Sequence, residues 1–594
     1  MKKLIISVGI IMALFYSCSE SFLDQAPQGK TSENVFYNEK GINALLTGAY
    51  GMVKGSALWT VSWGASIQNW TYGSAASDDA YKGSELGDQK PVNEIERWEV
   101  PTTNNYPAEK WRLNIGMGVN RANIVLNVIA KTPTLPEATA TRFKAEARFL
   151  RGLFYFESRL VFGDKIPLIS EDKVLTAKDI KNVNAPGAVL DFIIADLKYA
   201  WENLPETQAE PGRPTKYAAM ALAARAYLQD LKYAEAKPLL DNIINSNKYT
   251  LMPNFFDNYR IVKDNNAESI FEIQSAVNDI NESLNGEMGI GLNWPHGSDI
   301  GMCCGFHQPS QNLANAFKVD AVTGLPLFDT FNNTDLKNDQ GIASDADFVP
   351  TTDPLDPRID WTMGRRGIPY LDWGIMRGRD WIRYQPDGGP YLPVEKTFFY
   401  KSQRNSLSTT TGWQTGINAN NYRYIRYTHV LLWRAEVAAF EGDLATARTY
   451  VNQIRDRADN EVVMGKVNIT KLPPSVYPWG AAGDVDFTQP AANYKIGLYP
   501  AFADKNEAMR AVQWEIRLEF ATEGMRFFDL RRWDKATVGR IDMAATLNAF
   551  ARADERVRTS FMKGATFEEK DKYQPIPQGQ IDIQPGVLEQ NDGY

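Results

Sequence analysis

Two segments with the same helical pattern constrain the fold more than any other feature of the sequence. In the first, apolar residues recur at helical spacing over 217–229 and 233–244, with a very short turn between them. Leu222 and Leu240 belong to the apolar stripes, and the alanines around Ala224 allow the two helices to approach closely. The segment therefore predicts a helical hairpin of the tetratricopeptide type.

The second copy lies at 427–458, and its turn is Glu441-Gly442-Asp443. Four positions of the first hairpin align with four of the second: Ala224, Ala236, Leu240 and Ile243 with Ala435, Ala447, Val451 and Ile454. Because one hairpin cannot bury its apolar face alone, we expect the hairpins to stack on further helices. Long helical patterns are available for this at 111–130, 138–162, 188–204 and 507–522.

The stretch from about 251 to 420 is rich in Gly, Pro, Asn, Asp and aromatic residues. A structureless run of this length is uncommon in a compact domain, so we expect short strands and helices there. The predicted fold is mainly α: a tetratricopeptide-like helical-hairpin repeat scaffold with a large loop-rich insertion containing short strands. The expected boundaries are a scaffold at about 40–250 and 421–545, a variable ligand-binding loop region at about 251–420, and a C-terminal tail at 546–594.

The first residues are typical of a secretory signal, with a short basic start and an almost wholly apolar run from Leu4 to Tyr16. This run is shorter than the ~20 residues that span hydrocarbon as a helix. We therefore expect a signal peptide at 1–17 and a single domain at 18–594, with Cys18 as the site of lipid attachment. An ordinary secretory signal followed by an unmodified cysteine is the alternative.

Charge and composition restrict the class of partner. The net charge is -8 and no cluster of Lys and Arg is present, which argues against binding nucleic acid, whose phosphates need a concentrated basic surface. Aromatic residues make up 12% of the chain, including 15 Trp and 26 Tyr. Such a composition suits a surface that stacks on flat, weakly polar ligands, although most of these rings belong in the core.

Three segments resemble the SusD/RagB family of nutrient-uptake lipoproteins. Residues 21–27 read SFLDQAP and are similar to the family's opening. Residues 514–533 read WEIRLEFATEGMRFFDLRRW and resemble its signature nearly throughout. The segment 573–594 resembles its terminus, with Asp592 in place of the more usual proline. With the hairpins between them, the likeness spans nearly the whole mature chain.

The resemblance implies a lipid-anchored protein at the outer membrane, facing the cell exterior. Its implied partner is a SusC-like TonB-dependent transporter, over which the protein acts as a lid. Family members mostly bind oligosaccharides or polysaccharides, and some take peptides as RagB does. We therefore expect a glycan-binding protein of polysaccharide utilisation, not an enzyme and without a cofactor, with peptide uptake as the alternative.

The signature contains three carboxylates at helical spacing, Glu515, Glu519 and Glu523, which also suits a catalytic interpretation. Arginines bracket them, however, and opposite charges lower the pKa of a carboxyl group and keep it ionised. A general acid needs a proton to give. We therefore predict that this segment is structural, an ion-pair lattice on a docked helix that Gly524 terminates.

Family motifs do not reach the ligand residues, so candidate site residues follow from sugar chemistry: an aromatic platform flanked by hydrogen-bonding groups. The first candidate stretch is 63–81, which offers Trp70, Tyr72, Asp78 and Asp79 among Gly and Ser, with no helical stripe to explain them. The alternative for each ring is a place in the core.

The second candidate stretch, 294–307, offers Trp294, His296, Cys303 and Cys304 as ligand-binding residues. Zinc is a poor fit, because adjacent cysteines do not readily reach one tetrahedral ion and export is oxidising, so we expect no metal. With Cys18 acylated, the only intramolecular disulfide joins the two neighbours in a strained ring, and such strain is tolerated mainly at functional surfaces. Reduced, buried thiols are the alternative.

The third candidate stretch, 373–383, alternates aromatic residues with guanidinium donors, and Trp373 and Arg379 are its candidate ligand residues. An arginine fork can hold two adjacent hydroxyls or a carboxylate. A strand with one exposed charged face is the competing interpretation.

Two rival classes of function stay open. The sequence has three His and no hydrolase, zinc-protease or phosphate-loop motif. A glycoside hydrolase needs only two carboxylates, which 72 acidic residues always offer. A purely structural repeat scaffold, which binds other proteins, predicts no affinity for small ligands.

Overall fold

The computed structural model describes residues 33–55, 63–277, 285–297, 303–394, 400–403, 417–472 and 483–594. The predicted signal peptide and Cys18 lie outside these residues. Among the helices that are described, none combines the length and the apolar character needed to cross a bilayer.

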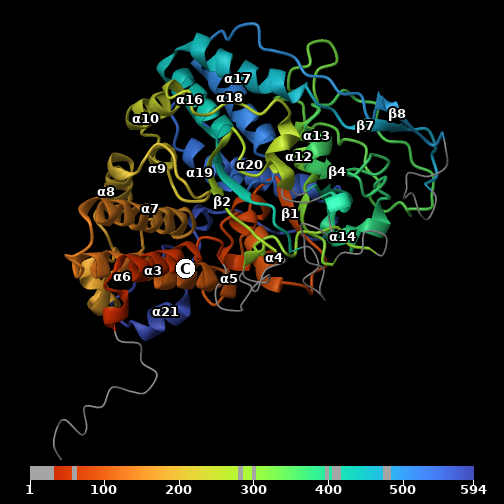
Figure 1. Ribbon diagram of the computed structural model, residues 1–594. Helices are drawn as coiled ribbons and strands as arrows, with labels where there is room; N and C mark the ends of the chain where they lie inside the picture. The colour runs from red at the N-terminus through yellow and green to blue at the C-terminus, as the bar shows by residue number, and fades with distance from the viewer. Residues whose placement is uncertain are drawn as a thin grey trace, which may run out of the picture.

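The N-terminal part of the described chain is helical (Figure 1). Its α-helices are α3 (Glu39–Tyr50), α4 (Lys90–Glu96), α5 (Asn105–Trp111), α6 (Asn120–Ala130), α7 (Glu137–Phe162), α8 (Ala188–Asn203), α9 (Lys216–Gln229) and α10 (Tyr233–Asn245). The shorter turns are η1 (Glu33–Phe36), η2 (Trp63–Ala65) and η5 (Glu171–Asp179), with π-helical segments η3 (Trp70–Ala75) and η4 (Arg112–Val119).

The middle of the chain has short elements only, as expected for the loop-rich stretch. They are β2 (Ser269–Ile273), β3 (Phe306–Pro309), α12 (Gln311–Ala316), α13 (Ile359–Thr362), β4 (Met363–Gly364), α14 (Gln385–Gly388), β5 (Leu392–Pro393) and β6 (Tyr422–Arg426), with turns η6 (Phe255–Tyr259), η7 (Ile261–Lys263), η8 (Arg379–Trp381) and η9 (Lys401–Gln403). The described strands form antiparallel pairs, β2 with β6 and β4 with β5. β1 (Ala80–Gly83), which precedes α4, pairs with β3.

The C-terminal part is helical again. Its elements are α16 (Tyr427–Glu441), α17 (Leu444–Ala458), β7 (Met464–Val467), β8 (Val485–Pro490), α18 (Lys505–Glu519), α19 (Arg526–Trp533), α20 (Met543–Asp554), η11 (Glu569–Lys572) and α21 (Gln578–Ile583). β7 and β8 pair with each other. The prediction of a mainly helical fold with a strand-bearing insertion is confirmed.

The two predicted hairpins are α9–α10 and α16–α17, and their aligned positions have one physical role. All eight residues of the alignment have 0% exposure: Ala224, Ala236, Leu240, Ile243, Ala435, Ala447, Val451 and Ile454. Gly442 ends α16 with a φ of 90°, and the Asp443 side chain accepts a hydrogen bond from the Thr446 N–H at 3.1 Å to begin α17. The turn predicted at 441–443 is therefore a helix stop followed by a helix cap.

The two hairpins pack on each other through α10 and α16, although they are distant in sequence. The ring of Tyr233 stacks on Phe440 with centroids 4.4 Å apart, and its hydroxyl donates to Glu436 Oε1 at 3.0 Å. Arg532 of α19 holds the other oxygen of Glu436 at 2.8 Å. Stacking of repeats thus buries the apolar faces that one hairpin would leave exposed.

The C-terminal part returns to the N-terminal part, since the N–H of Gln578 at the start of α21 donates to the carbonyl of Thr102 at 2.9 Å and the Gln584 side chain donates to the carbonyl of Lys178 at 2.8 Å. The closest approach is between η3 and the turn after α18. A Cβ added to Gly524, whose φ is 73°, would lie 1.9 Å from the carbonyl oxygen of Gln68, and one added to Gly73 would lie 1.8 Å from that of Gly524. The prediction that Gly524 ends the helix is wrong, because α18 already stops at Glu519 with Phe520 as its C-cap. Gly524 instead permits a backbone contact that no larger residue allows.

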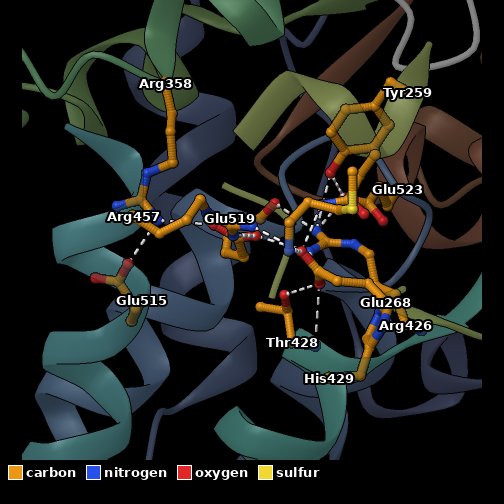
Figure 2. Close-up of polar contacts among 12 residues, drawn as sticks. Tyr259, Glu268, Arg358, Arg426, Thr428, His429, Arg457, Glu515, Glu519 and Glu523 are labelled. Carbon is orange, nitrogen blue, oxygen red and sulfur yellow. Dashed lines mark hydrogen bonds and ion pairs between the residues drawn. The ribbon is translucent and has the colours of Figure 1, made fainter. Parts of the chain in front are cut away.

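The signature carboxylates form a buried lattice of ion pairs (Figure 2). Glu519 is fully buried and accepts from Arg426 at 2.7 Å and from Arg358 at 3.1 Å. Arg457 of α17 holds the same carboxylate at 2.5 Å. Burial by itself would raise the pKa of Glu519, but these three guanidiniums lower it to about 2. The group is therefore ionised, as the structural interpretation of the signature requires.

Other members extend the lattice to neighbouring elements. Arg358 and Arg455 bind the two oxygens of Glu515, and Arg426 also reaches Glu523 at 3.1 Å. Glu268 accepts from Arg457 at 2.9 Å. The lattice thus connects α18, α17 and β6 with the segments that precede β2 and α13.

The two tryptophans proposed from sequence as stacking platforms, Trp70 and Trp294, lie in the core with 1% and 0% exposure. Trp70 packs against Phe306 and His307, and its indole N–H donates to the carbonyl of Gly289 at 3.0 Å. The expectation that these rings are exposed is wrong, because both belong to the hydrophobic core, and β3 packs on Trp70.

We predict that Glu519→Ala lowers the free energy of unfolding by about 3–5 kcal/mol, because it leaves buried guanidiniums without their shared partner. Denaturant unfolding at neutral pH measures this. The matched control is Glu507→Ala, an exposed position on the same helix, where a change below about 1 kcal/mol is expected.

The pH dependence gives a second readout of the same variant. Because the pKa of Glu519 is depressed in the folded state from an ordinary value of 4.5 to about 2, its stabilisation is complete above pH 4.5 and is lost as the pH falls toward 2. The difference between wild type and Glu519→Ala should narrow across that window. If the difference in unfolding free energy stays constant between pH 4.5 and 2, the stabilising role of ionised Glu519 in the lattice is contradicted.

For the core tryptophans, we predict that Trp70→Ala or Trp294→Ala costs about 3–5 kcal/mol of stability, as expected for a large ring removed from a packed interior. Thermal melts of each variant test this. Tyr384→Ala, which removes an aromatic ring that is 50% exposed, is the control and should leave the melting temperature nearly unchanged. An unaltered melting curve for both tryptophan variants would contradict the burial of these rings in the core.

Candidate functional site

The fold brings the three candidate stretches together. β1 begins at the end of the first stretch and β3 at the end of the second, and their antiparallel pairing places Tyr81 opposite Gln308 and Gly83 opposite Phe306. The third stretch joins them through the backbone, because the His296 N–H donates to the carbonyl of Trp381 at 2.9 Å. Residues far apart in the sequence thus share one region of the molecule.

Cys303 and Cys304 form a disulfide between neighbours, so the alternative of reduced thiols is not what the structure contains. Cys304 has a φ of 113°, a conformation that L residues rarely adopt, and Gly305 follows with a φ of 68°. Cys303 is partly exposed, whereas Cys304 is 4% exposed. Backbone strain of this kind persists only where the surroundings impose it, and it is concentrated at functional sites.

A loop between β1 and α4 supplies charged groups beside the disulfide. Arg383 binds Asp88 and Glu85, each at 2.6 Å, with its own side chain 27% exposed. Its Nη1 also donates to the hydroxyl of Ser84 at 3.3 Å. The backbone of Ser84 is anchored in turn, since its N–H donates to the carbonyl of Gly305 at 2.5 Å.

Lys82 fixes the shape of this loop from inside. Its ammonium donates to the carbonyls of Glu85 and Asp88, both at 2.7 Å. Burial lowers the pKa of Lys82 to about 8, although Glu96 and Asp88 favour its charged form. A buried amine that bridges two carbonyls holds the loop in one conformation and so fixes the carboxylates that Arg383 binds.

His296 and Arg383 both lie close to Gly305. A Cβ built on Gly305 would lie 3.7 Å from the Cβ of His296 and 3.5 Å from that of Arg383. Burial lowers the pKa of His296, and the charge of Arg383 lowers it further. Within the part of the chain that the structure describes, no group hydrogen-bonds its buried Nδ1. A neutral imidazole can both donate to and accept from a hydroxyl group.

We call this surface the disulfide face and define it by Glu85, Asp88, His296, Cys303 and Arg383. It places a guanidinium fork, two carboxylates and an imidazole around one partly exposed disulfide, and Ser84, which is 0% exposed, supports the loop from inside. Forked donors with adjacent acceptors match the paired hydroxyls of a sugar. Tyr384, which is 50% exposed and follows Arg383, adds an aromatic ring to the neighbouring sequence.

The sequence-predicted residues fall into two groups. His296 and Cys303 are partly exposed and Arg379 is exposed, whereas Cys304 is buried beside its partner. The expectation of exposure is wrong for the others, which are at most 3% exposed: Trp70, Tyr72, Asp78, Asp79, Trp294 and Trp373. A ligand does not reach a side chain that solvent does not reach.

Asp78 and Asp79 are buried because they pair with the signature. Arg526 donates to Asp78 at 2.8 Å, and Arg517 donates to Asp79 at 3.0 Å. Burial would raise the pKa of Asp78, but Arg517 and Arg526 hold it below its ordinary value. These aspartates therefore join β1 to α18 and α19, a role that no local sequence pattern indicates.

Sequence reasoning missed Ser84, Glu85 and Asp88. The signal was a polar loop, Ser84-Glu85-Leu86-Gly87-Asp88, directly after a strand. Arg383 stood in the third stretch as one guanidinium among several, and only its two ion pairs distinguish it.

Comparisons with known proteins agree on one family. A model described as the SusD family matches residues 267–594, and one described as starch-binding associating with outer membrane matches 21–228. A SusD-like protein of Bacteroides ovatus is 28% identical over 293 residues, which are 46% of this chain and 50% of that protein. The chain thus spans about half the length of this curated relative.

Two solved structures share the fold. A SusD-like protein from Bacteroides fragilis superposes with a TM-score of 0.65 at 20% identity, covering 96% of this chain and 100% of that one. Surface glycan-binding protein A from Bacteroides thetaiotaomicron, in complex with laminarihexaose, gives 0.58 at 20% identity, covering 93% and 99%. Since the SusD family model alone matches more than half of its residues, the chain belongs to the SusD family.

Proposed function

We propose that this protein is a surface lipoprotein that binds an oligosaccharide at the disulfide face and delivers it to a SusC-like TonB-dependent transporter. The observation that carries the proposal is the convergence of Arg383, His296 and the two carboxylates around a partly exposed disulfide. Membership of the SusD family supports it, as does the laminarihexaose complex of a similar structure.

The chemistry of the face is that of a polar ligand with many hydroxyl groups. Glu85 and Asp88 both pair with Arg383, which offsets part of their charge while they accept hydroxyl donors from the ligand. His296 offers a donor and an acceptor, and Arg383 offers a planar fork. The disulfide with Tyr384 supplies the less polar contact that a sugar ring face needs.

Of the residues predicted from sequence, His296, Cys303, Cys304 and Arg379 fit this proposal. Arg379 belongs to η8, which ends two residues before Arg383 in the chain. Two of the buried predicted residues support the strands beneath this face, since Trp70 packs on β3 and Asp79 ties the start of β1 to α18.

The anchor and the transporter complete the proposed function. A diacylglycerol on Cys18 would hold the protein at the outer membrane, because each buried methylene contributes ~0.8 kcal/mol and several chains bind firmly. A protein tethered at the cell exterior and seated on a barrel can pass its ligand on without chemistry.

We predict that Arg383→Ala lowers affinity for the bound glycan by about tenfold or more, because a hydrogen bond from a charged donor contributes about 1.5–3 kcal/mol. A glycan array that includes laminarihexaose would identify the ligand, and calorimetry would give the affinities. Arg97→Ala is the matched control, since that arginine is also in a half-exposed pair, with Glu99. Wild-type affinity in a folded Arg383→Ala variant would show that the glycan does not bind at the disulfide face.

A separate prediction concerns the anchor. Cys18→Ala should move the protein from the membrane fraction to the soluble fraction of cells that lack the partner transporter, because the lipid is the proposed tether. Fractionation followed by immunoblotting measures this. Retention in the membrane of such cells would show that another segment holds the protein.

A further inference from the structure

A cavity lies against α18, the helix that carries part of the signature. It has a volume of about 580 Å³ and is lined mainly by α18, α20 and the segments 328–332 and 539–541. Pockets for small ligands typically have ~300–1,000 Å³. Its lining includes none of the five residues that define the disulfide face. We call it the aromatic pocket.

Partly exposed aromatic rings form one wall of the aromatic pocket. Trp514 meets Phe328 and Phe331 edge to face, with centroids 5.3 and 5.0 Å apart and interplanar angles of 86° and 81°. The indole N–H of Trp514 donates to the carbonyl of Ala316 at 3.3 Å, which fixes the ring. All three rings are partly exposed. A contiguous patch of exposed apolar side chains often marks a binding site.

The floor of the pocket is charged but internally balanced. Arg517 and Arg526 line it with side chains only 2% and 9% exposed, and both pair with Asp78. Asp79 provides a second carboxylate for Arg517. Two guanidiniums and two carboxylates therefore leave no net charge at the floor.

The rim is different, because its arginines are exposed. Arg510 pairs with Asp329, with side chains 43% and 80% exposed, and Arg540 pairs with Asp534 at 3.1 Å, with its own side chain 59% exposed. Lys572 also binds Asp534, at 2.7 Å, so Arg540 shares its carboxylate. Exposed ion pairs contribute little free energy, and both guanidiniums can therefore turn to a ligand at small cost.

We propose that the aromatic pocket binds an acidic sugar, with the face of the ring against Phe331 and Trp514 and its carboxylate or sulfate held by Arg510 and Arg540. Guanidinium forks bind such groups with two parallel hydrogen bonds. Asn332 and Asn506 also line the pocket and offer partners for hydroxyl groups. The pocket is thus a second carbohydrate site, with a preference for negative charge that the disulfide face, with its two carboxylates, does not share.

Calorimetric titration of the mature protein with digalacturonic acid and with a chondroitin disaccharide tests the proposal, with cellobiose as the neutral probe. We expect saturable binding of at least one acidic probe and a loss of about tenfold or more in Arg510→Gln/Arg540→Gln. Binding should also weaken with added NaCl, since the rim is exposed. Phe331→Ala should reduce affinity as well, and its melting curve checks the fold.

The matched control is Arg552→Gln/Lys563→Gln, which removes the same charge at exposed positions outside the pocket lining and should bind like wild type. Arg383→Ala should also keep its affinity for the acidic probe, which separates this proposal from the site on the disulfide face. No saturable binding of either acidic probe up to about 10 mM would overturn the proposal. So would equal affinity in the pocket variant and wild type, or a loss confined to Arg383→Ala.

Discussion

The buried lattice around Glu519 is the interaction on which the rest of the structure depends. A carboxylate with 0% exposure is stable as a charge only when guanidiniums surround it, and here three arginines from three segments do so. Each arginine is itself buried or nearly so and would be destabilising without its partner. The lattice therefore requires β6, α17 and the segment before α13 to be in place together with α18. It makes the helical repeats and the insertion one cooperative unit.

A buried ion pair also connects the helical scaffold to the disulfide face. Arg517 of α18 binds Asp79, and Asp79 precedes the strand whose partner β3 follows the disulfide. Gly73 and Gly524 permit the backbone contact between η3 and the turn after α18. The loop with Glu85 and Asp88 therefore follows a strand that is held by its pairing with β3 and by the ion pair of Asp79 just before it. A rigid support of this kind suits a binding surface, because less freedom remains to be lost when a ligand binds.

The two proposed sites differ in how their charge is arranged. On the disulfide face, one arginine lies between two carboxylates, so the surface presents acceptors as well as a fork. In the aromatic pocket, Asp78 lies at the floor, whereas the rim contributes the exposed arginines Arg510 and Arg540, whose partners Asp329 and Asp534 are not among the lining residues. The first arrangement suits neutral hydroxyls, and the second suits an anion. Two sites of different preference would allow one protein to hold a mixed glycan at more than one point.

The sequence by itself determined the helical hairpins, the loop-rich insertion, the family and the structural role of the signature. These properties follow from local periodicity and from a continuous motif. Ala224 and Ala435 occupy the same position in the two hairpins, where a small residue lets the paired helices approach, and Glu515 and Glu519 share one helix face. Only the tertiary structure decided which candidate side chains reach the surface. Trp70 and Trp294 look like loop residues in the sequence, but both are buried in the core, Trp70 against β3. Asp78 looks like a ligand group in the sequence, but it pairs with Arg526. Exposure depends on which distant segment packs over a residue, and no local pattern contains that information.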